Sequence, residues 1–274
     1  MKLKNLFILG DIGFLNNNLQ TVVNQVSNQI QVDDIITVLG DNFYPNGVSS
    51  LNDYQWDTYN DIFKNVKNPV YSILGNHDYL QNPKAQIYSD NWIMDGWYFK
   101  KEFDNIDLYF LDTSQFNLEW VPNDILKKNH NLESEILIEN QINWLSDELE
   151  KNKDKKKLVF GHYPLISNGV YAKKLDKMYN SLIDIFVKYN VNIYISGHEH
   201  NIQYINRKID SLDFNQLIIG SSSENRNDVD TCIDIDMIDN KEIFFGKLSI
   251  NNDNFEIKYF NKLGELKHNF KIQN

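Results

Sequence analysis

The chain has 274 residues, a length compatible with one large domain or two small ones. Hydrophobic residues make up 42% of it, including 16 Phe and 15 Tyr, and this content excludes global disorder. The formal net charge of −11 argues against nonspecific binding to nucleic acid, because phosphates would be repelled. A phosphate ester at a metal site stays compatible with this charge, because bound cations set the local field.

Several features favour a cytoplasmic protein. The single cysteine, Cys232, excludes an internal disulfide and a cysteine-rich zinc site. The apolar run 6–9 continues directly into Gly10 without a small-residue cleavage site, so we interpret it as a strand rather than a signal peptide. The chain has no Asn-x-Ser/Thr sequon, and no apolar stretch approaches the roughly 18 residues of a membrane span.

Buried strands alternate with helices in the first part of the chain. The runs 6–9, 35–39 and 70–74 are continuously apolar, as expected for strands covered on both faces. Helical periodicity connects them over residues 19–30 and 51–66. Strand–helix–strand order of this kind is the signature of a parallel sheet with crossover helices.

The middle of the chain again alternates strands with helices, whereas its last part contains strands alone. Strands are predicted at 106–111, 158–160, 191–195 and 217–219, and helices at 138–149 and 175–186. From residue 244 onward the hydrophobicity alternates with period two around a turn at 262–264, which predicts an antiparallel meander.

Two segments show no clear period. Residues 79–103 are aromatic and turn-rich, and residues 114–131 are predicted to form a long surface loop that contains Trp120 and His130. The basic run 151–157 is interpreted as a solvated helix end. No Pro/Gly/Ser-rich linker divides the chain, so we expect one domain over residues 1–274.

Five predicted strands end in a glycine followed by a polar residue with lone pairs. These polar residues are Asp11, Asp41, Asn76, His162 and His198. In open α/β sheets, ligands bind outside the carboxyl ends of the strands, so we expect the five to converge. Each tetrapeptide alone is compatible with an ordinary turn or helix cap. Together they contain, with His77 and His200, four of the six histidines and predict one site.

The donor types of this set indicate metal binding. Carboxylate oxygens combined with a few imidazoles suit Fe, Mn or Zn rather than Cu. The set has too many ligands for one four-coordinate ion, and two aspartates at parallel strand ends permit one bridging carboxylate. A two-metal site is therefore predicted, and the usual work of such a site is hydrolysis of phosphate esters.

The order of the motifs resembles the calcineurin-like metallophosphoesterases. The motifs are Asp11-x-Gly13, Gly40-Asp41-x-x-Tyr44, Gly75-Asn76-His77-Asp78, Val159-x-x-His162 and Gly197-His198-x-His200. Tyr44 resembles the purple acid phosphatases in particular, and the length is similar to the small mammalian tartrate-resistant type. The resemblance covers nearly the whole chain and implies an α/β fold of two mixed β-sheets packed face to face, with helices on the outside.

The resemblance also implies a ligand set for two metal ions. One ion would be held by Asp11, Asp41, Tyr44 and His200, and the other by Asp41, Asn76, His162 and His198, with Asp41 bridging. In most related phosphatases the first motif has a histidine where this chain has Gly13. The resemblance implies that Tyr44 replaces this histidine as a metal ligand. A phenolate favours Fe(III), which implies Fe(III) paired with Fe(II), Zn or Mn.

The implied reaction is hydrolysis of a small phosphomonoester by a metal-bound hydroxide. His77 would bind the phosphate beside Asn76 and donate a proton to the leaving group. The chain departs from the family at residues 165–172, where a second substrate histidine is missing, and Tyr171 is predicted to contact the phosphate. This departure leaves the pH optimum open, and the oligomeric state is open too. A phosphodiesterase, a nucleotide pyrophosphatase and a non-catalytic scaffold are the alternatives.

Four further residues lie outside the ligand motifs. Asp112 ends a strand without belonging to a ligand motif, so a structural hydrogen-bonding role is expected. His268 alternates with apolar residues and is predicted to be an inward, hydrogen-bonded side chain, whereas His130 is predicted to lie in a polar loop. Trp120 is a candidate for covering the pocket.

Overall fold

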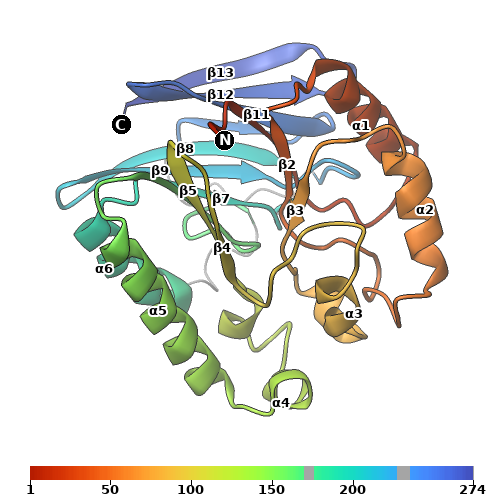
Figure 1. The fold of residues 1–274 in the computed structure, drawn as a ribbon, viewed down its shortest axis with the longest axis horizontal. Helices are drawn as coiled ribbons and strands as arrows, with labels where there is room; N and C mark the ends of the chain where they lie inside the picture. The colour runs from red at the N-terminus through yellow and green to blue at the C-terminus, as the bar shows by residue number, and fades with distance from the viewer. Residues whose placement is uncertain (170–175, 227–234, 274) are drawn as a thin grey trace.

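Two mixed β-sheets face each other in the computed structural model, which describes residues 1–169, 176–226 and 235–273 (Figure 1). The strand order is β13-β12-β11-β1-β2-β3 in the first sheet and β10-β8-β9-β7-β6-β5-β4 in the second. Helices α1 and α2 lie on one side of the molecule, and α5 and α6 lie on the other. The predicted α/β fold of two facing mixed sheets with outer helices is confirmed.

The first sheet contains strands from both ends of the described chain. Its parallel part is β1 (Asn5–Leu9), β2 (Ile35–Val38) and β3 (Val70–Ser72), connected through α1 (Asn17–Gln29) and α2 (Tyr54–Phe63). The predicted meander forms the other part, with β11 (Phe244–Ile250), β12 (Asn254–Asn261) and β13 (Leu266–Gln273). Because β11 pairs antiparallel with β1, the C-terminal hairpins extend the sheet on which the first site residues lie.

The second sheet has a parallel centre and antiparallel edges. Its centre is β5 (Ile106–Phe110), β6 (Lys156–Phe160), β7 (Ile193–Ser196) and β9 (Leu212–Ile219). The edges are β4 (Phe99–Glu102), β8 (Ile202–Ile209) and β10 (Met237–Asp239). Helices α5 (Ser134–Lys151) and α6 (Asp176–Tyr189) provide the crossovers between the central strands.

The central strands are buried on both faces. In β6, Leu158 and Phe160 belong to the core between the sheets, whereas Val159 belongs to a second core beneath the helices. Leu145 of α5 and Phe186 of α6 pack in that second core. Since successive side chains of a strand point to opposite faces, two covered faces require the continuous apolar runs seen in the sequence.

The stretch that was predicted to be a long surface loop is largely structured, and that prediction was wrong. It contains the 3-10 helix η2 (Ser114–Phe116) and the helix α4 (Asn123–His130), and Val121 and Leu126 are fully buried. Helix α4 has only eight residues, of which Leu126 and Asn129 are buried, so it shows no apolar stripe.

Other short elements were also not predicted. The 3-10 helix η1 (His77–Leu80), helix α3 (Pro83–Ile87) and strand β4 interrupt the turn-rich stretch 79–103. Strands β8 and β10 were missed as well. Among the described helices, none is long and apolar enough to cross a membrane. The single-domain assignment stays a prediction.

Candidate metal centre

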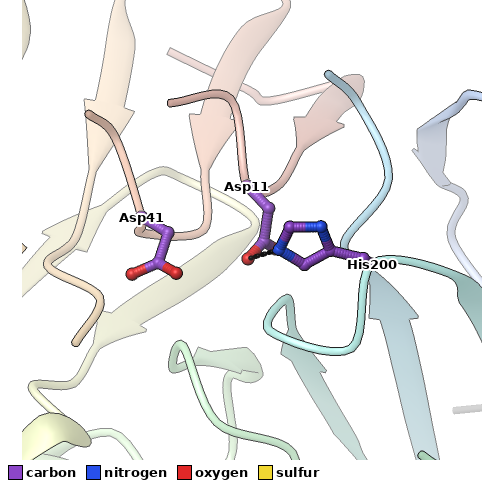
Figure 2. Close-up of side chains that lie close together, drawn as sticks. All are labelled: Asp11, Asp41 and His200. Carbon is purple, nitrogen blue, oxygen red and sulfur yellow. Dashed lines mark ion pairs between the residues drawn. The ribbon is translucent and has the colours of Figure 1, made fainter. Parts of the chain in front are cut away.

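The strand ends of both sheets meet at one edge of the molecule. Asp11, Asp41 and Asn76 follow β1, β2 and β3 of the first sheet, whereas His162 and His198 follow β6 and β7 of the second. The side chains converge because parallel strands in each sheet end at the same edge and the two sheets face each other. Figure 2 shows His200 pointing toward Asp11, with the Asp41 carboxylate beside them. The predicted convergence is therefore observed.

One half of the site is centred on the phenol of Tyr44. Its hydroxyl lies 3.3 Å from Oδ1 of Asp11, 3.0 Å from Oδ2 of Asp41 and 2.9 Å from Nε2 of His200. One ligand atom each from Asp11, Asp41 and His200 lies within 4.8 Å of the others. Carboxylate, phenol and imidazole atoms gathered in this way form a donor set that suits a hard or borderline metal cation.

The other half is centred on His162. Its Nδ1 lies 2.8 Å from the carbonyl oxygen of Leu39 and can only donate there, so Nε2 carries the lone pair. That Nε2 lies 3.1 Å from Oδ1 of Asn76, 3.2 Å from Nδ1 of His198 and 3.5 Å from Oδ1 of Asp41. Atoms that carry lone pairs repel one another at these distances. A cation bound between them would be attracted to all of them and would remove this repulsion.

Burial keeps the imidazoles in the neutral form that metals bind. It lowers the pKa of His162, lowers that of His198 well below its usual range, and brings the pKa of His200 to about 3. Burial, followed by the neighbouring Asp41 charge, raises the pKa of Asp11 and of Tyr44 well above their usual ranges. A bound cation would instead lower the pKa of both oxygen ligands, Asp11 and Tyr44. The electrostatics of the cluster therefore favour a cation.

The backbone at the site is strained. Asp11, Asp41, His198 and His200 all have positive φ, at 54°, 50°, 73° and 48°. Left-handed backbone costs a residue with a side chain about 1–2 kcal/mol. Such conformations cluster where a structure holds side chains for function. Their presence at four predicted ligands supports a functional role for this edge.

The packing of Gly13 explains the unusual first motif. A Cβ atom added at Gly13 would lie 2.7 Å from the backbone nitrogen of Tyr44 and 2.8 Å from its ring atom Cδ2. These distances are shorter than van der Waals contact, so a side chain at position 13 and the Tyr44 ring exclude each other. Glycine in the first motif and tyrosine in the second thus form one structural unit.

His77 lies at the mouth of the site. Its Nδ1 is 2.6 Å from the carbonyl oxygen of Pro45, and its Nε2 is 3.9 Å from Oδ2 of Asp41. The side chain is 24% exposed, and its ring packs edge-on against Tyr44 with centroids 4.7 Å apart. The Trp120 ring lies 6.1 Å from it. His77 therefore presents one nitrogen to the site while the backbone holds the other.

Asp78 is a positioning residue to which the sequence analysis assigned no role. Its buried carboxylate accepts hydrogen bonds from the backbone nitrogens of Asn42 (3.0 Å) and Gly75 (2.8 Å) and from Nε2 of Gln86 (2.9 Å). It therefore joins the turn that carries Asp41 to the turn that carries Asn76. Its place as the last residue of the motif Gly75-Asn76-His77-Asp78 was the available signal.

Thr113 performs a similar task in the second sheet. Its Oγ1 accepts hydrogen bonds from the backbone nitrogens of His162 and Tyr163, both at 3.0 Å. The preceding residue, Asp112, accepts from the Tyr79 hydroxyl, and its backbone nitrogen donates to Oε1 of Gln141 at 2.8 Å. Asp112 therefore has the structural hydrogen-bonding role that was expected.

The remaining histidines lie outside the cluster. Nε2 of His268 is 3.1 Å from Oδ2 of Asp239, so the side chain is half-buried and hydrogen-bonded as predicted. His130 is not in a polar loop. It ends α4 and packs on Trp97 with ring centroids 3.9 Å apart, so the polar-loop prediction was wrong because this stretch is helical. Tyr171, the predicted phosphate contact, lies outside the described residues.

The comparison with protein families agrees with this geometry. The model of the calcineurin-like phosphoesterase family matches residues 4–201, a stretch that includes all the strand ends described above. The chain belongs to this family. The family match shows a phosphoesterase domain, and the individual ligand assignments stay predictions.

Curated relatives of this chain include acid phosphatases. Tartrate-resistant acid phosphatase type 5 from rabbit is 31% identical over 223 residues, which cover 72% of this chain and 67% of the rabbit protein. The human protein of that name is 31% identical over 65% of this chain and 58% of its own length. Purple acid phosphatase 3 from Arabidopsis thaliana is 28% identical over 76% of this chain and 60% of its length. The matched stretch thus spans about three fifths of the human and plant proteins.

Two solved structures share the fold. GAP50, described as the anchor in the inner membrane complex of Plasmodium, superposes with a TM-score of 0.80 at 21% identity and covers 98% of this chain and 88% of its own. The purple acid phosphatase PPD1 from yellow lupin seeds has a TM-score of 0.74 at 15% identity, over 98% of this chain and 53% of its own. At these identities the likeness establishes the fold alone.

Proposed function

We propose that this phosphoesterase is a dinuclear metal-dependent phosphatase that hydrolyses phosphomonoesters in the manner of the purple acid phosphatases. The observation that carries the proposal is the arrangement of the predicted ligands, whose lone-pair atoms face one another at the meeting edge of two sheets. The acid phosphatase relatives at about 30% identity support the same reaction class.

The donor set divides into two halves that share Asp41. One half, for the ion we expect to be Fe(III), consists of Asp11, Asp41, Tyr44 and His200. The other, for Fe(II), Zn or Mn, consists of Asp41, Asn76, His162 and His198. The two oxygens of Asp41 point apart, with Oδ2 3.0 Å from the Tyr44 hydroxyl and Oδ1 3.5 Å from Nε2 of His162. A carboxylate that faces both halves has the orientation a bridging ligand needs.

When bound, the metal ions supply Lewis-acid activation of the attacking water and of the phosphoryl oxygens. The chain supplies the proton for the leaving group. His77 is suited to this task because its Nδ1 donates to the carbonyl of Pro45, so a protonated ring presents Nε2–H at the mouth of the site. Asn76 and Tyr171 would position the phosphate.

Two other functions stay as alternatives. A phosphodiesterase or nucleotide pyrophosphatase would use the same donor set with a different substrate. A scaffold would retain the fold without the reaction, and one solved structure of this fold is described as an anchor. Every predicted ligand in the described residues is present and oriented into the cluster, which favours an enzyme over a scaffold.

Hydrolysis assays on matched substrates test the proposal. The metal-loaded chain should hydrolyse p-nitrophenyl phosphate much faster than bis-p-nitrophenyl phosphate. Asp41→Asn should abolish this activity, because both halves of the site lose a charged ligand. The control Asp33→Asn removes a carboxylate that pairs with Lys4 at the surface and should leave the rate unchanged. Faster diester cleavage would establish the diesterase alternative, and no hydrolysis of either ester would favour the scaffold.

A further inference from the structure

A surface hollow of about 310 Å³ lies beside the Tyr44 half of the candidate metal centre. Most of the residues that line it are apolar or aromatic, and they include Phe14, Leu15, Tyr44, Pro45 and Tyr54. The side chains of Phe14 and Tyr54 are 42% and 77% exposed. Apolar side chains that are exposed together around one hollow, rather than singly, are typical of a ligand-binding groove.

The hollow adjoins the candidate metal centre through Tyr44 and Pro45. The Tyr44 hydroxyl lies among the predicted metal ligands, whereas the Tyr44 ring packs on Phe14 with centroids 4.5 Å apart. The same ring packs on His77 with centroids 4.7 Å apart, and the Pro45 carbonyl oxygen lies 2.6 Å from Nδ1 of His77. The proposed proton donor for the leaving group therefore lies next to the wall of the hollow.

The wall that contains Phe14 is fixed to the turn that carries Asp41. The backbone nitrogen of Gly13 donates to the carbonyl of Asp41, and the backbone nitrogen of Tyr44 donates to the carbonyl of Gly13, both at 3.0 Å. Leu15 has a φ of 46°, a left-handed conformation that is unfavourable for a residue with a side chain. Because such strain clusters at active sites and ligand clamps, it supports a functional role for the turn that presents Phe14.

The wall that contains Tyr54 is the first turn of α2. Asp53 caps this helix and accepts hydrogen bonds from the backbone nitrogens of Gln55 at 3.1 Å and Ser49 at 2.9 Å. Nε2 of Gln55 donates to the carbonyl of Gly47 at 3.0 Å, which holds the helix end against the preceding loop. Both walls of the hollow are therefore in place before a ligand binds, as is usual for ligand sites.

The size and lining of the hollow select the kind of group that fits. An apolar cavity of about 150 Å³ in another protein holds benzene, so this hollow has room for roughly two fused rings. We propose that it binds the alcohol part of the phosphomonoester while the phosphate lies at the metal centre, and that Phe14 and Tyr54 make the site prefer large aromatic alcohols. This inference rests on the proposed function and names the substrate class of the same site. The ester oxygen that joins the two parts then lies near His77.

Binding of phosphonates to the metal-loaded protein tests the inference. Methylphosphonate and naphthylphosphonate have the same anionic group and are not hydrolysed, because carbon replaces the ester oxygen. Burial of one aromatic ring corresponds to about a 10- to 100-fold gain in affinity, so the wild type should bind naphthylphosphonate at least about 10-fold more tightly in calorimetry. Phe14→Ala and Tyr54→Ala should each remove most of this preference and leave the affinity for methylphosphonate unchanged.

Tyr88→Ala is the matched control, because Tyr88 is 70% exposed but lines a different cavity together with Trp97. This variant should keep the wild-type preference. Equal affinity of the wild type for the two phosphonates, or a preference that persists in both Phe14→Ala and Tyr54→Ala, overturns the inference. An equal loss of affinity for both phosphonates in these variants would show that they disturb the phosphate site, and it overturns the inference too.

Hydrolysis of p-nitrophenyl phosphate by the same preparations tests the proposed function separately. An inactive protein that still prefers naphthylphosphonate supports the apolar subsite and contradicts the proposed reaction. An active protein that binds both phosphonates equally contradicts the subsite and leaves the proposed reaction standing. Absence of binding of either phosphonate to the metal-loaded protein overturns both.

Discussion

Replacing Asp11 by asparagine should stabilise the metal-free protein and destabilise the metal-loaded one. Asp11 is fully buried, and one of its ligand atoms lies within 4.8 Å of those of Asp41 and His200. At an effective dielectric constant of about 20, two carboxylate charges at this separation repel by roughly 3.5 kcal/mol. Asparagine removes the charge while its side-chain oxygen can still accept the 2.8 Å hydrogen bond from the backbone nitrogen of His198.

The net gain in the metal-free protein should be smaller than the full repulsion. Burial and the Asp41 charge already raise the pKa of Asp11 well above its usual range, so part of the repulsion is relieved by proton uptake. We expect a gain of about 1–3 kcal/mol in the free energy of unfolding, which corresponds to a rise in Tm of about 2–10 °C. In the metal-loaded protein, a 100-fold loss of metal affinity would remove about 2.7 kcal/mol of the stabilisation that bound metal adds to the free energy of unfolding.

Calorimetric melting at pH 7.5, with chelator and with saturating metal, measures both effects. Asp34→Asn is the matched control, because Asp34 is also fully buried but accepts hydrogen bonds from Asn5 and Gln31 away from the site. The control should lower Tm equally with and without metal. A lower Tm for metal-free Asp11→Asn, or an unchanged stabilisation by metal, would show that the Asp11 and Asp41 charges do not repel each other in this way.

Three further predictions concern the proton donor, the phenol and the buried acids. His77→Gln should lower kcat for alkyl phosphates by a factor of about 10²–10⁴. It should lower kcat much less for p-nitrophenyl phosphate, because that leaving group needs no proton. Equal losses for the two substrates would contradict proton donation by His77. Iron-loaded protein should show a visible charge-transfer band that Tyr44→Phe abolishes, and a band that persists would exclude Tyr44 as a ligand. Burial raises the pKa of Asp78, Asp112 and Glu199 to about 7, so the folded state holds protons that the unfolded state has released. Urea unfolding of metal-free protein should therefore show stability falling from pH 6.5 to 8, and a rise would argue against these shifts.

Much of the fold could be predicted because its strands are buried on both faces. A short, continuously apolar run that is followed by glycine, such as the one in β6, does not have the period of an amphipathic helix and therefore indicates a strand. The convergence of Asp11, Asp41, Asn76, His162 and His198 followed from the same argument, since parallel strands place their carboxyl ends at one edge. These features depend on local sequence and on one rule of sheet topology.

Other features depend on contacts that sequence patterns do not report. Helix α4 presents few apolar residues, and its burial is determined by the segments around it. Asp78 and Thr113 hold the turns of other strands through hydrogen bonds, which requires knowledge of which turns are neighbours.

Metal stoichiometry measured together with phosphatase activity tests whether the site works with two metal ions. Metal-free protein is titrated with Fe, Zn or Mn, and the bound ions per chain are counted by elemental analysis while p-nitrophenyl phosphate hydrolysis is followed. We predict that activity rises until two ions are bound per chain, one for each half of the site around Asp41. Full activity with one ion, or two bound ions without hydrolysis, would contradict it.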